Sequence, residues 1–375
     1  MLRVLLVHAG FEIGGTETQI LNLLTHADPD EVRFEVAWTA RSPGSGYETF
    51  RATGAPIHRV RDSKLVLPLI PRLRRLIAAR GYDAVCGFCA QNIGRAMMVA
   101  RSCGVRSRLA CYRSTDPHLE GIRPRALYLR LDRWLSLRHA TRLLGNSQAV
   151  LDGYFPDRPT SSDRYRVWPN GLAMARFEAP VDREAVRHSL GLDPGDLVVG
   201  YLGRFIKSKN LPTVVRVAKR LSADRPNLRL LLVGYGPELD AVQAAVKEAG
   251  LAGRAVLPGA RTDAPAMLAS MDLFVFPSLY EGFPNALLEA MAAGVPFVAS
   301  DIGPNIEAVP EDARSFLAPP TDVNRLTDLA ERLLRDRDLS MGLAAACRRH
   351  VAENYSIEMN LRRLLGFIRE DCGKP

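Results

Sequence analysis

The chain has 375 residues, of which 47% are hydrophobic, so it is too long for one ordinary domain and suits two, each with a substantial core. No apolar run approaches the ~20 residues that cross a bilayer, and the first residues read as a strand instead of a secretory signal. Six scattered cysteines exclude a disulfide framework, and we expect a cytoplasmic protein that is soluble or bound to a surface.

The net charge of +9 is concentrated in the first half of the chain. Residues 1–172 hold 25 Lys and Arg against 15 Asp and Glu, a charge of +10, whereas residues 173–375 hold 25 against 26, a charge of −1. One domain is therefore expected to meet an anionic partner, which could be a phospholipid surface, a phosphorylated acceptor or nucleic acid. Nucleic acid is disfavoured, since no recognised fold or stacking motif accompanies the charge.

Both halves alternate apolar strands with helical periodicity, which is typical of parallel sheets covered on both faces by helices. In the first half we expect strands near 2–8, 33–38, 56–60, 83–88, 107–112, 142–145 and 165–168. In the second half we expect them near 197–203, 228–234, 254–258, 273–277, 295–299 and 314–318. Ligands of such sheets bind beyond the carboxyl ends of the strands.

Two basic amphipathic stretches in the first half have two interpretations. The segments 64–80 and 122–144 place Leu, Ile, Tyr128 and Trp134 among many arginines. They could be interfacial helices on an anionic membrane, or ordinary core-packed helices whose arginines are solvated. Both interpretations stay open.

The segment LVVGYLGRFIKSKN, residues 197–210, reads as a strand that runs into Gly203, followed by Arg204 and, five residues on, Lys209. Two cations beside a strand end are suited to a departing nucleoside diphosphate, whose negative charge grows in the transition state. The alternative is a basic loop in a basic protein.

The segment EGFPNALLEAMAAG, residues 281–294, places Glu281 and Glu289 eight positions apart across a loop-to-helix junction. Pro284 is suited to the first helical position, so the helix is expected to begin near it. The unpaired N–H groups of the first turn would form an electropositive patch for a diphosphate, between two acids that face different parts of one ligand.

These two segments resemble the G-R-x4-K and E-x7-E signatures of the family-4 retaining glycosyltransferases, which have the GT-B architecture. The resemblance implies two Rossmann-like, doubly wound parallel-sheet domains that face each other across a cleft. It covers essentially the whole chain, strongly from 197 to 307 and loosely before 140. Asn210 stands where the family often has glycine, which bears on the conformation of the loop and not on the charges.

The resemblance also implies roles for the residues of the donor site. Glu281 would contact hydroxyls of the donor sugar, Glu289 would hold the ribose, and Arg204 and Lys209 beside Gly203 would neutralise the diphosphate. The backbone near Arg261 would be available to the base. The backbone segment that would reach the sugar and phosphates comprises Gly282, Phe283, Pro284, Asn285 and Ala286.

Two positions of the first half complete the implied site. Gly15 lies in a loop before an amphipathic helix and would let the backbone approach the donor phosphate or the acceptor, although most Gly-Gly pairs are simply turns. His118 is the candidate for a group that faces the sugar or the acceptor, and a solvated loop histidine is the alternative. The loop is not a G-x-G-x-x-G fingerprint, which argues against binding of NAD.

The expected domains are not sequential, because the last helix resembles the segment that returns to the first domain. The acceptor-side domain is expected to comprise residues 1–172 and 356–375, and the donor-binding domain residues 173–355. We expect no cofactor and no catalytic metal, since DPD at 28–30 and DRD at 336–338 fall at helix ends and not after a central strand. The CGFC pair, Cys86 and Cys89, is interpreted as small buried thiols and not as a redox or zinc site.

The sequence thus predicts a retaining hexosyltransferase. It would move a sugar from a nucleotide diphosphate, with UDP favoured only by family frequency, to a hydroxyl acceptor in polysaccharide or glycolipid synthesis. Two alternatives stay open: a nucleotide-sugar epimerase of the same architecture, and a non-catalytic protein that binds sugar nucleotides or lipid. The oligomeric state cannot be read from the sequence.

Overall fold

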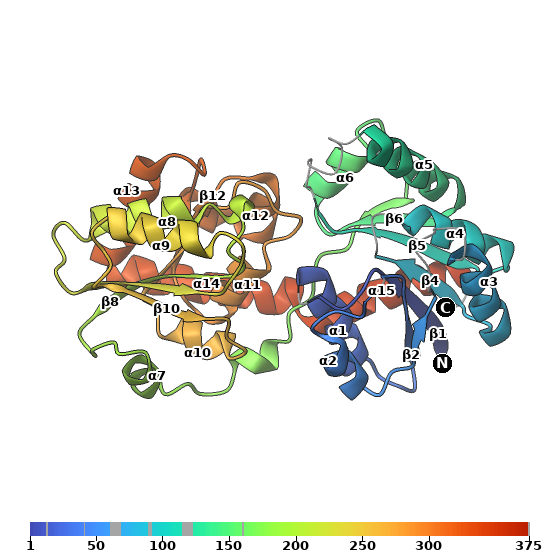
Figure 1. Ribbon diagram of the computed structural model, residues 1–375, viewed down its shortest axis with the longest axis horizontal. Helices are drawn as coiled ribbons and strands as arrows, with labels where there is room; N and C mark the ends of the chain where they lie inside the picture. The colour runs from blue at the N-terminus through green and yellow to red at the C-terminus, as the bar shows by residue number, and fades with distance from the viewer. Residues whose placement is uncertain are drawn as a thin grey trace. The chain divides into compact units, whose positions relative to one another are not determined.

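The computed structural model describes residues 1–12, 14–40, 42–60, 69–88, 92–114, 123–159 and 161–373. The chain divides into two compact units, one formed by Met1–Gly171 with Ile357–Pro375 and the other by Leu172–Ser356. Each unit is built around one parallel sheet and is described by itself (Figure 1).

The first unit has a seven-stranded sheet in the order β3-β2-β1-β4-β5-β6-β7, in which every described pairing is parallel. Its strands are β1 (Leu2–His8), β2 (Val32–Trp38), β3 (Ile57–Arg59), β4 (Ala84–Gly87), β5 (Ser107–Tyr112), β6 (Arg142–Gly145) and β7 (Tyr165–Val167). Its helices are α1 (Gly15–His26), α2 (Tyr47–Ala52), α3 (Leu69–Arg80), α4 (Ile93–Ser102), α5 (Arg123–His139), α6 (Gln148–Tyr154) and α15 (Ile357–Cys372).

The helices of the first unit cover both faces of its sheet. Helix α4 packs between α3 and α5, whereas α1 packs against α15 (Figure 1). The apolar side chains of α3 point inward, since Leu69, Leu73 and Ile77 are all buried in the core. The strands read as near-continuous apolar runs because both faces are buried.

The second unit has a six-stranded sheet in the order β10-β9-β8-β11-β12-β13, again with parallel pairings throughout its described ladders. Its strands are β8 (Leu197–Leu202), β9 (Leu228–Val233), β10 (Ala255–Gly259), β11 (Leu273–Phe276), β12 (Phe297–Ser300) and β13 (Leu317–Ala318). Its α-helices are α7 (Arg183–Ser189), α8 (Leu211–Leu221), α9 (Leu239–Glu248), α10 (Ala264–Ala269), α11 (Asn285–Ala292), α12 (Gly303–Ala308), α13 (Val323–Arg335) and α14 (Arg337–Tyr355). Short 3₁₀ turns lie at η2 (Met174–Phe177), η3 (Lys207–Lys209) and η4 (Glu311–Phe316).

Helices α8, α9 and α13 cover one face of this second sheet, and α10, α11 and α14 lie over the other (Figure 1). The centre of the sheet is tightly packed. Gly200 in β8 has no room for a side chain, because an added Cβ would lie 2.2 Å from the sulfur of Met271.

The predicted fold class, two doubly wound parallel α/β sheets, is confirmed. Two local predictions are wrong. The expected strand at 314–318 is mostly the 3₁₀ turn η4, and only Leu317–Ala318 pair with β12. Helix α11 begins at Asn285, so Pro284 is its N-cap and not its first helical residue.

No helix in the described part of the chain is both long and apolar enough to cross a membrane. The described cysteines are free thiols: Cys86, Cys111, Cys347 and Cys372 are buried and Cys103 is half-buried. Cys89 lies outside the described residues.

Candidate functional site

The strand order of the second unit reverses between β8 and β11, which are neighbours in the sheet although β9 and β10 lie between them in sequence. In open parallel sheets, ligands bind beyond the carboxyl ends of the strands at such a switch point. The loop after β8 carries Gly203, Arg204 and Lys209, and the loop after β11 carries Glu281. The two sequence motifs therefore meet where the topology predicts a ligand site.

Glycines allow two carboxyl-end loops, those after β8 and β9, to pack directly on one another. An added Cβ at Gly234 would lie 1.9 Å from the carbonyl oxygen of Gly203, and one at Gly236 would lie 2.3 Å from that of Phe205. Gly203 itself has a φ of 149°, and its added Cβ would lie 2.7 Å from the hydroxyl of Tyr201. Side chains at these positions would separate the loops and move the cations that follow.

An ion pair joins the two motifs. The Lys209 ammonium lies 2.5 Å from the Glu281 carboxylate, and the exposed fractions of the two side chains are 16% and 8%. The Lys209 ammonium also lies 5.4 Å from the centre of the Phe276 ring. The backbone supports this approach, since the amide of Leu279 donates to the carbonyl of Ser208 at 2.7 Å. A cation held by one carboxylate and one aromatic face keeps donors for an anionic ligand.

Arg204 is exposed, and within the described ranges its guanidinium forms no salt bridge. Beneath it lies Tyr201, which is fully buried and donates from its hydroxyl to the Arg204 carbonyl at 3.3 Å. Burial raises the pKa of Tyr201, the Glu281 charge raises it further and the Arg204 charge lowers it. Both charged groups are thus close to one buried phenol, which no local sequence pattern indicated.

Helix α11 directs its amino end to the same edge of the sheet. The Asn285 amide donates to the Phe283 carbonyl at 3.0 Å, and the first helical bond runs from Leu288 to Pro284. The amides of Ala286 and Leu287 precede that bond and have no partner inside the helix. Gly282, Phe283 and Pro284 connect this first turn to Glu281.

Glu289 lies in the second turn of α11 and is half-buried. Burial raises the pKa of Glu289 to about 7, and the nearby Arg176 charge only partly opposes this effect. Within the described part of the protein the carboxylate of Glu289 accepts no hydrogen bond, which leaves its oxygens open to hydroxyl donors.

Arg261 lies in the exposed loop after β10. Its guanidinium forms a two-point ion pair with Asp263 of the same loop, at 2.9 and 2.7 Å. The side chain is therefore engaged locally, and the backbone of this loop is what remains for a ligand.

The position of Asn210 is often glycine in the family, and the backbone conformation there explains why. Asn210 has a φ of 54° and a ψ of 43°, the left-handed conformation that glycine adopts most readily. Its side-chain amide donates to the carbonyls of Pro277 and Pro320, at 3.1 and 2.8 Å. Asparagine therefore fixes the loop that carries Lys209 by hydrogen bonds.

The remaining predicted residues belong to the first unit. Gly15 is the exposed first residue of α1. His118 lies outside the described residues, so its predicted role is not addressed by the structure. The acidic pairs at 28–30 and 336–338 lie beside helix ends, and the described residues contain no group of three or more His, Cys, Asp and Glu placed to hold a metal ion.

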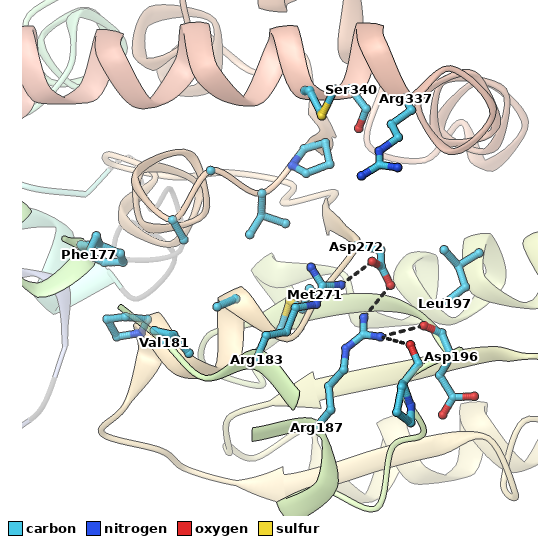
Figure 2. A pocket seen from close by; sticks show the side chains of 18 of the residues that line it. Phe177, Val181, Arg183, Arg187, Asp196, Leu197, Met271, Asp272, Arg337 and Ser340 are labelled. Carbon is cyan, nitrogen blue, oxygen red and sulfur yellow. Dashed lines mark hydrogen bonds and ion pairs between the residues drawn. The ribbon is translucent and has the colours of Figure 1, made fainter. Parts of the chain in front are cut away.

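A large pocket of about 830 Å³ lies at the opposite edge of the second sheet, where β8 and β11 begin, and was not predicted (Figure 2). Two of its arginines, Arg183 and Arg187, are already paired. Arg187 donates to the carbonyls of Ser270 at 3.1 Å and Asp196 at 3.0 Å and to the Asp272 carboxylate at 2.7 Å, and Arg183 also pairs with Asp272. These contacts tie loops together, so we place the candidate site at the carboxyl edge despite the size of this pocket.

Comparisons with known proteins indicate the family of the chain. The sequence profile described as "Glycosyl transferases group 1" matches residues 182–350, and that described as "Glycosyltransferase Family 4" matches residues 13–176. The chain is 27% identical over 307 residues to the putative glycosyltransferase EpsF of Bacillus subtilis (strain 168), covering 80% of this chain and 79% of EpsF. It is 32% identical to the lipopolysaccharide core biosynthesis mannosyltransferase LpsB of Rhizobium meliloti (strain 1021), over 52% of this chain and 58% of LpsB.

Solved structures share the fold. Anabaena Alr3699/HepE in complex with UDP superposes with a TM-score of 0.84 at 19% identity, covering 98% of this chain and 100% of HepE. Its complex with UDP-glucose gives a TM-score of 0.80 at 20% identity, over 99% and 100% of the two chains. With both sequence profiles and the fold in agreement, the chain belongs to the family-4 (group 1) glycosyltransferases of GT-B fold.

Proposed function

We propose that this glycosyltransferase transfers a hexose from a UDP-sugar to an acceptor hydroxyl with retention of configuration. The donor-binding domain is residues 173–355, and the acceptor-side domain is residues 1–172 with 356–375. The observation that carries the proposal is the Lys209–Glu281 ion pair, which joins the G-R-x4-K and E-x7-E motifs at the switch point of the second sheet.

The cations and amides of this edge stabilise the leaving diphosphate. As the glycosyl bond breaks, negative charge develops on the phosphate oxygen, and fixed donors aimed at that oxygen lower the barrier. Arg204, Lys209 and the first-turn amides of α11 supply such donors, with Gly203 and Gly282 letting the backbone come close. This role requires cations that are not fully engaged by the protein, which is the state of Arg204.

The two glutamates position the donor. Glu281 accepts hydrogen bonds from sugar hydroxyls while it is paired with Lys209. The ion pair makes it a weak nucleophile, so attack by the acceptor on the front face is favoured over a covalent intermediate. Glu289 accepts from the ribose hydroxyls, and the backbone near Arg261 contacts the base. Gly15 and His118 stay predictions for the other domain.

The choice of a UDP-sugar is supported by similar proteins. HepE is described in complex with UDP and with UDP-glucose, and a relative from Escherichia coli that is 28% identical is named as a galactosyltransferase that uses UDP-Gal. Relatives named for lipopolysaccharide core synthesis support a glycan or glycolipid acceptor.

The test compares Lys209→Ala and Glu281→Ala with the wild type, using binding of UDP-glucose and release of glucose or its transfer. We expect each variant to lose about 10³-fold or more in turnover while it keeps its melting temperature. Lys207→Ala is the matched control, since Lys207 is an exposed lysine of the same turn η3. Full activity in both site variants would refute the site, and turnover without any acceptor to an epimeric nucleotide sugar would identify an epimerase.

We also propose that α5 docks on an anionic membrane surface from the cytoplasmic side. Leu127, Leu131 and Trp134 recur at the spacing of one helix face and have exposed fractions of 70%, 47% and 57%. Arg130 and Arg138 beside them are exposed cations. An apolar stripe with tryptophan between arginines is typical of an interfacial helix. Helix α3 differs, because its apolar residues Leu69, Leu73 and Ile77 are buried.

Flotation with vesicles that contain phosphatidylglycerol tests this docking. We expect the wild type to float at low salt, and Leu131→Ser with Trp134→Ser to remain in the soluble fraction. Met341→Ser, which changes a 53% exposed side chain of the other unit, should float like the wild type. Recovery of the wild type only in the soluble fraction would rule out the docking.

A further inference from the structure

One edge of the Arg113 guanidinium in the first unit has no partner among the described residues. Arg113 follows the carboxyl end of β5, and its Nε and Nη2 atoms are buried without a hydrogen bond in the described structure. The Nη1 atom, in contrast, donates to the Asn170 side-chain oxygen at 2.6 Å and to the Trp168 carbonyl at 3.3 Å. Nε and Nη2 form the side of the guanidinium that binds a carboxylate or phosphate through two parallel hydrogen bonds.

The guanidinium is held rigidly with this edge free. It lies 4.1 Å from the centre of the Trp168 ring and 5.4 Å from that of Phe88. The Asn146 amide donates to the Arg113 carbonyl at 3.2 Å, which fixes the backbone. Stacking on two aromatic rings and a backbone clamp preorganise the side chain, so little conformational entropy is lost when a ligand binds.

The charge of Arg113 is not balanced within the described residues, where it forms no ion pair with a carboxylate. Burial lowers the pKa of Arg113 to about 10, so the guanidinium is still charged at neutral pH. Its burial therefore costs the free energy of desolvating a charge. A buried cation without a counter-ion is unfavourable unless an anion binds it.

Other unsatisfied polar atoms follow neighbouring strand ends. His8 ends β1, and its Nδ1 has no hydrogen-bond partner among the described residues, while its Nε2 lies 2.8 Å from Glu17. Asn146 follows β6, and its Oδ1 likewise lacks a partner in the described part of the chain. Strands β1, β4, β5 and β6 are consecutive in the sheet, and the order reverses between β1 and β4. Buried polar groups that lack partners and share the carboxyl edge of a sheet indicate a polar ligand.

We propose that Arg113 binds an oxyanion of the acceptor, a phosphate or a carboxylate, through its Nε and Nη2 atoms. Asn146 and His8 receive hydroxyl groups of the same molecule. This assignment rests on the proposed transferase function, because it places the acceptor in the first unit. It specifies the acceptor class as a hydroxylated molecule that carries a negative charge.

The fluorescence of Trp168 can report binding directly, because the guanidinium lies against its ring. In the full chain with Trp38→Phe and Trp134→Phe, Trp168 is the sole tryptophan. Methyl phosphate and glucuronate are titrated at constant ionic strength, with chloride as the reference anion. We expect a saturable change in emission for at least one of the two, and the tighter one identifies the source of the oxyanion. A linear response identical to chloride for both anions overturns the proposal.

Two variants test whether the change in Trp168 emission comes from binding at the Nε and Nη2 atoms of Arg113. Arg113→Lys keeps the charge but loses the two-point contact, and should weaken anion binding by about tenfold. Arg59→Met is the matched control, since Arg59 also lies over an aromatic side chain, that of position 38, 5.0 Å from the ring centre when this residue is Trp38. It should not change anion binding. Undiminished binding in Arg113→Lys overturns the two-point contact, and the wild-type titration keeps the test valid if the variant does not fold.

Binding of UDP-glucose to the same proteins separates acceptor from donor. We expect Arg113→Lys to bind UDP-glucose within about twofold of the wild type while its KM for the acceptor rises and kcat changes less. A parallel loss of UDP-glucose affinity would mean that Arg113 contacts the donor, and would overturn the proposal. Failure of the wild type to bind UDP-glucose would instead refute the proposed function and leave the anion titration to stand by itself.

Discussion

The two edges of the second sheet use the same residue types for different purposes. At the amino edge, Arg187 is 4% exposed and donates hydrogen bonds to backbone carbonyls and to the Asp272 carboxylate (Figure 2). At the carboxyl edge, Arg204 is exposed with no salt bridge to the described chain, and Lys209 has a single carboxylate. The number of internal partners, and not the charge itself, separates an arginine that stabilises the fold from one that is available to a ligand.

The largest effect on stability is expected at the amino edge. Arg187→Met should lower the free energy of unfolding by about 3–5 kcal/mol, because it leaves Asp272 short of a cation and several buried carbonyls without donors. Thermal melting should show a decrease of roughly 10 °C. The affinity of folded Arg187→Met for UDP-glucose should be unchanged. If Arg187→Met kept its melting temperature but lost activity, the distinction between the two edges would be contradicted.

The same substitution at the carboxyl edge should have the reverse result. Arg204→Met is expected to reduce turnover by about 10²–10³-fold, as loss of one donor to a developing oxyanion does. Its melting temperature should stay within about 1 °C of the wild type, because exposed groups without partners contribute little to stability. The test measures the turnover and the melting temperature of Arg204→Met and Arg187→Met side by side. A decrease in the melting temperature of Arg204→Met as large as that of Arg187→Met would contradict the difference between the two edges.

A pH titration sharpens the comparison at Glu289. Burial raises the pKa of Glu289 from its ordinary value of 4.5 to about 7, so the folded state binds this proton more tightly than the unfolded state. The free energy of unfolding therefore falls as pH rises between these values. Glu289→Gln, which cannot ionise, should melt like the wild type near pH 4.5 and higher than it at pH 8.

Ligand binding should show the opposite trend, because ribose hydroxyls donate to the ionised form. Wild-type affinity for UDP-glucose is expected to rise with pH through about 7, and that of Glu289→Gln to stay flat and lower. Glu331→Gln is the control, and its effect on stability should be opposite to that of Glu289→Gln. The hydrogen bond from Arg225 lowers the pKa of Glu331, so loss of the ionised carboxylate should reduce stability at pH 8. Identical pH profiles in wild type and Glu289→Gln would contradict the assignment.

The smallest expected effect concerns Asn210. Asn210→Gly keeps the left-handed conformation but loses the bonds to Pro277 and Pro320, and should cost about 1 kcal/mol. Asn210→Ala adds the strain of that conformation, about 1 kcal/mol more. Urea unfolding should rank wild type above the glycine variant and that variant above alanine. Equal stability of the wild type and both variants would show that Asn210 does not fix the loop that carries Lys209.

Much of the fold followed from the sequence because strand and helix periodicities are local. The strands of the first half lie within a residue or two of their expected positions, and β1, β5 and β6 match them fully. The segment 314–318 was misassigned because an apolar run of five residues does not distinguish a strand from a turn whose apolar side chains are buried. Pro284 was misplaced by one position, since a proline is compatible with both sites at the helix start.

The motifs Gly203 to Lys209 and Glu281 to Glu289, and the alternation that places both after strands, can be read from the amino-acid order alone, because they are patterns of neighbouring residues. The pairing of Lys209 with Glu281, 72 positions away, comes from the folded chain, since that contact depends on β8 lying beside β11. The folded chain also sets the burial that raises the pKa of Glu289 and the free edge of Arg113. Pairing and desolvation depend on which segments surround a group in space, and a linear pattern does not contain that information.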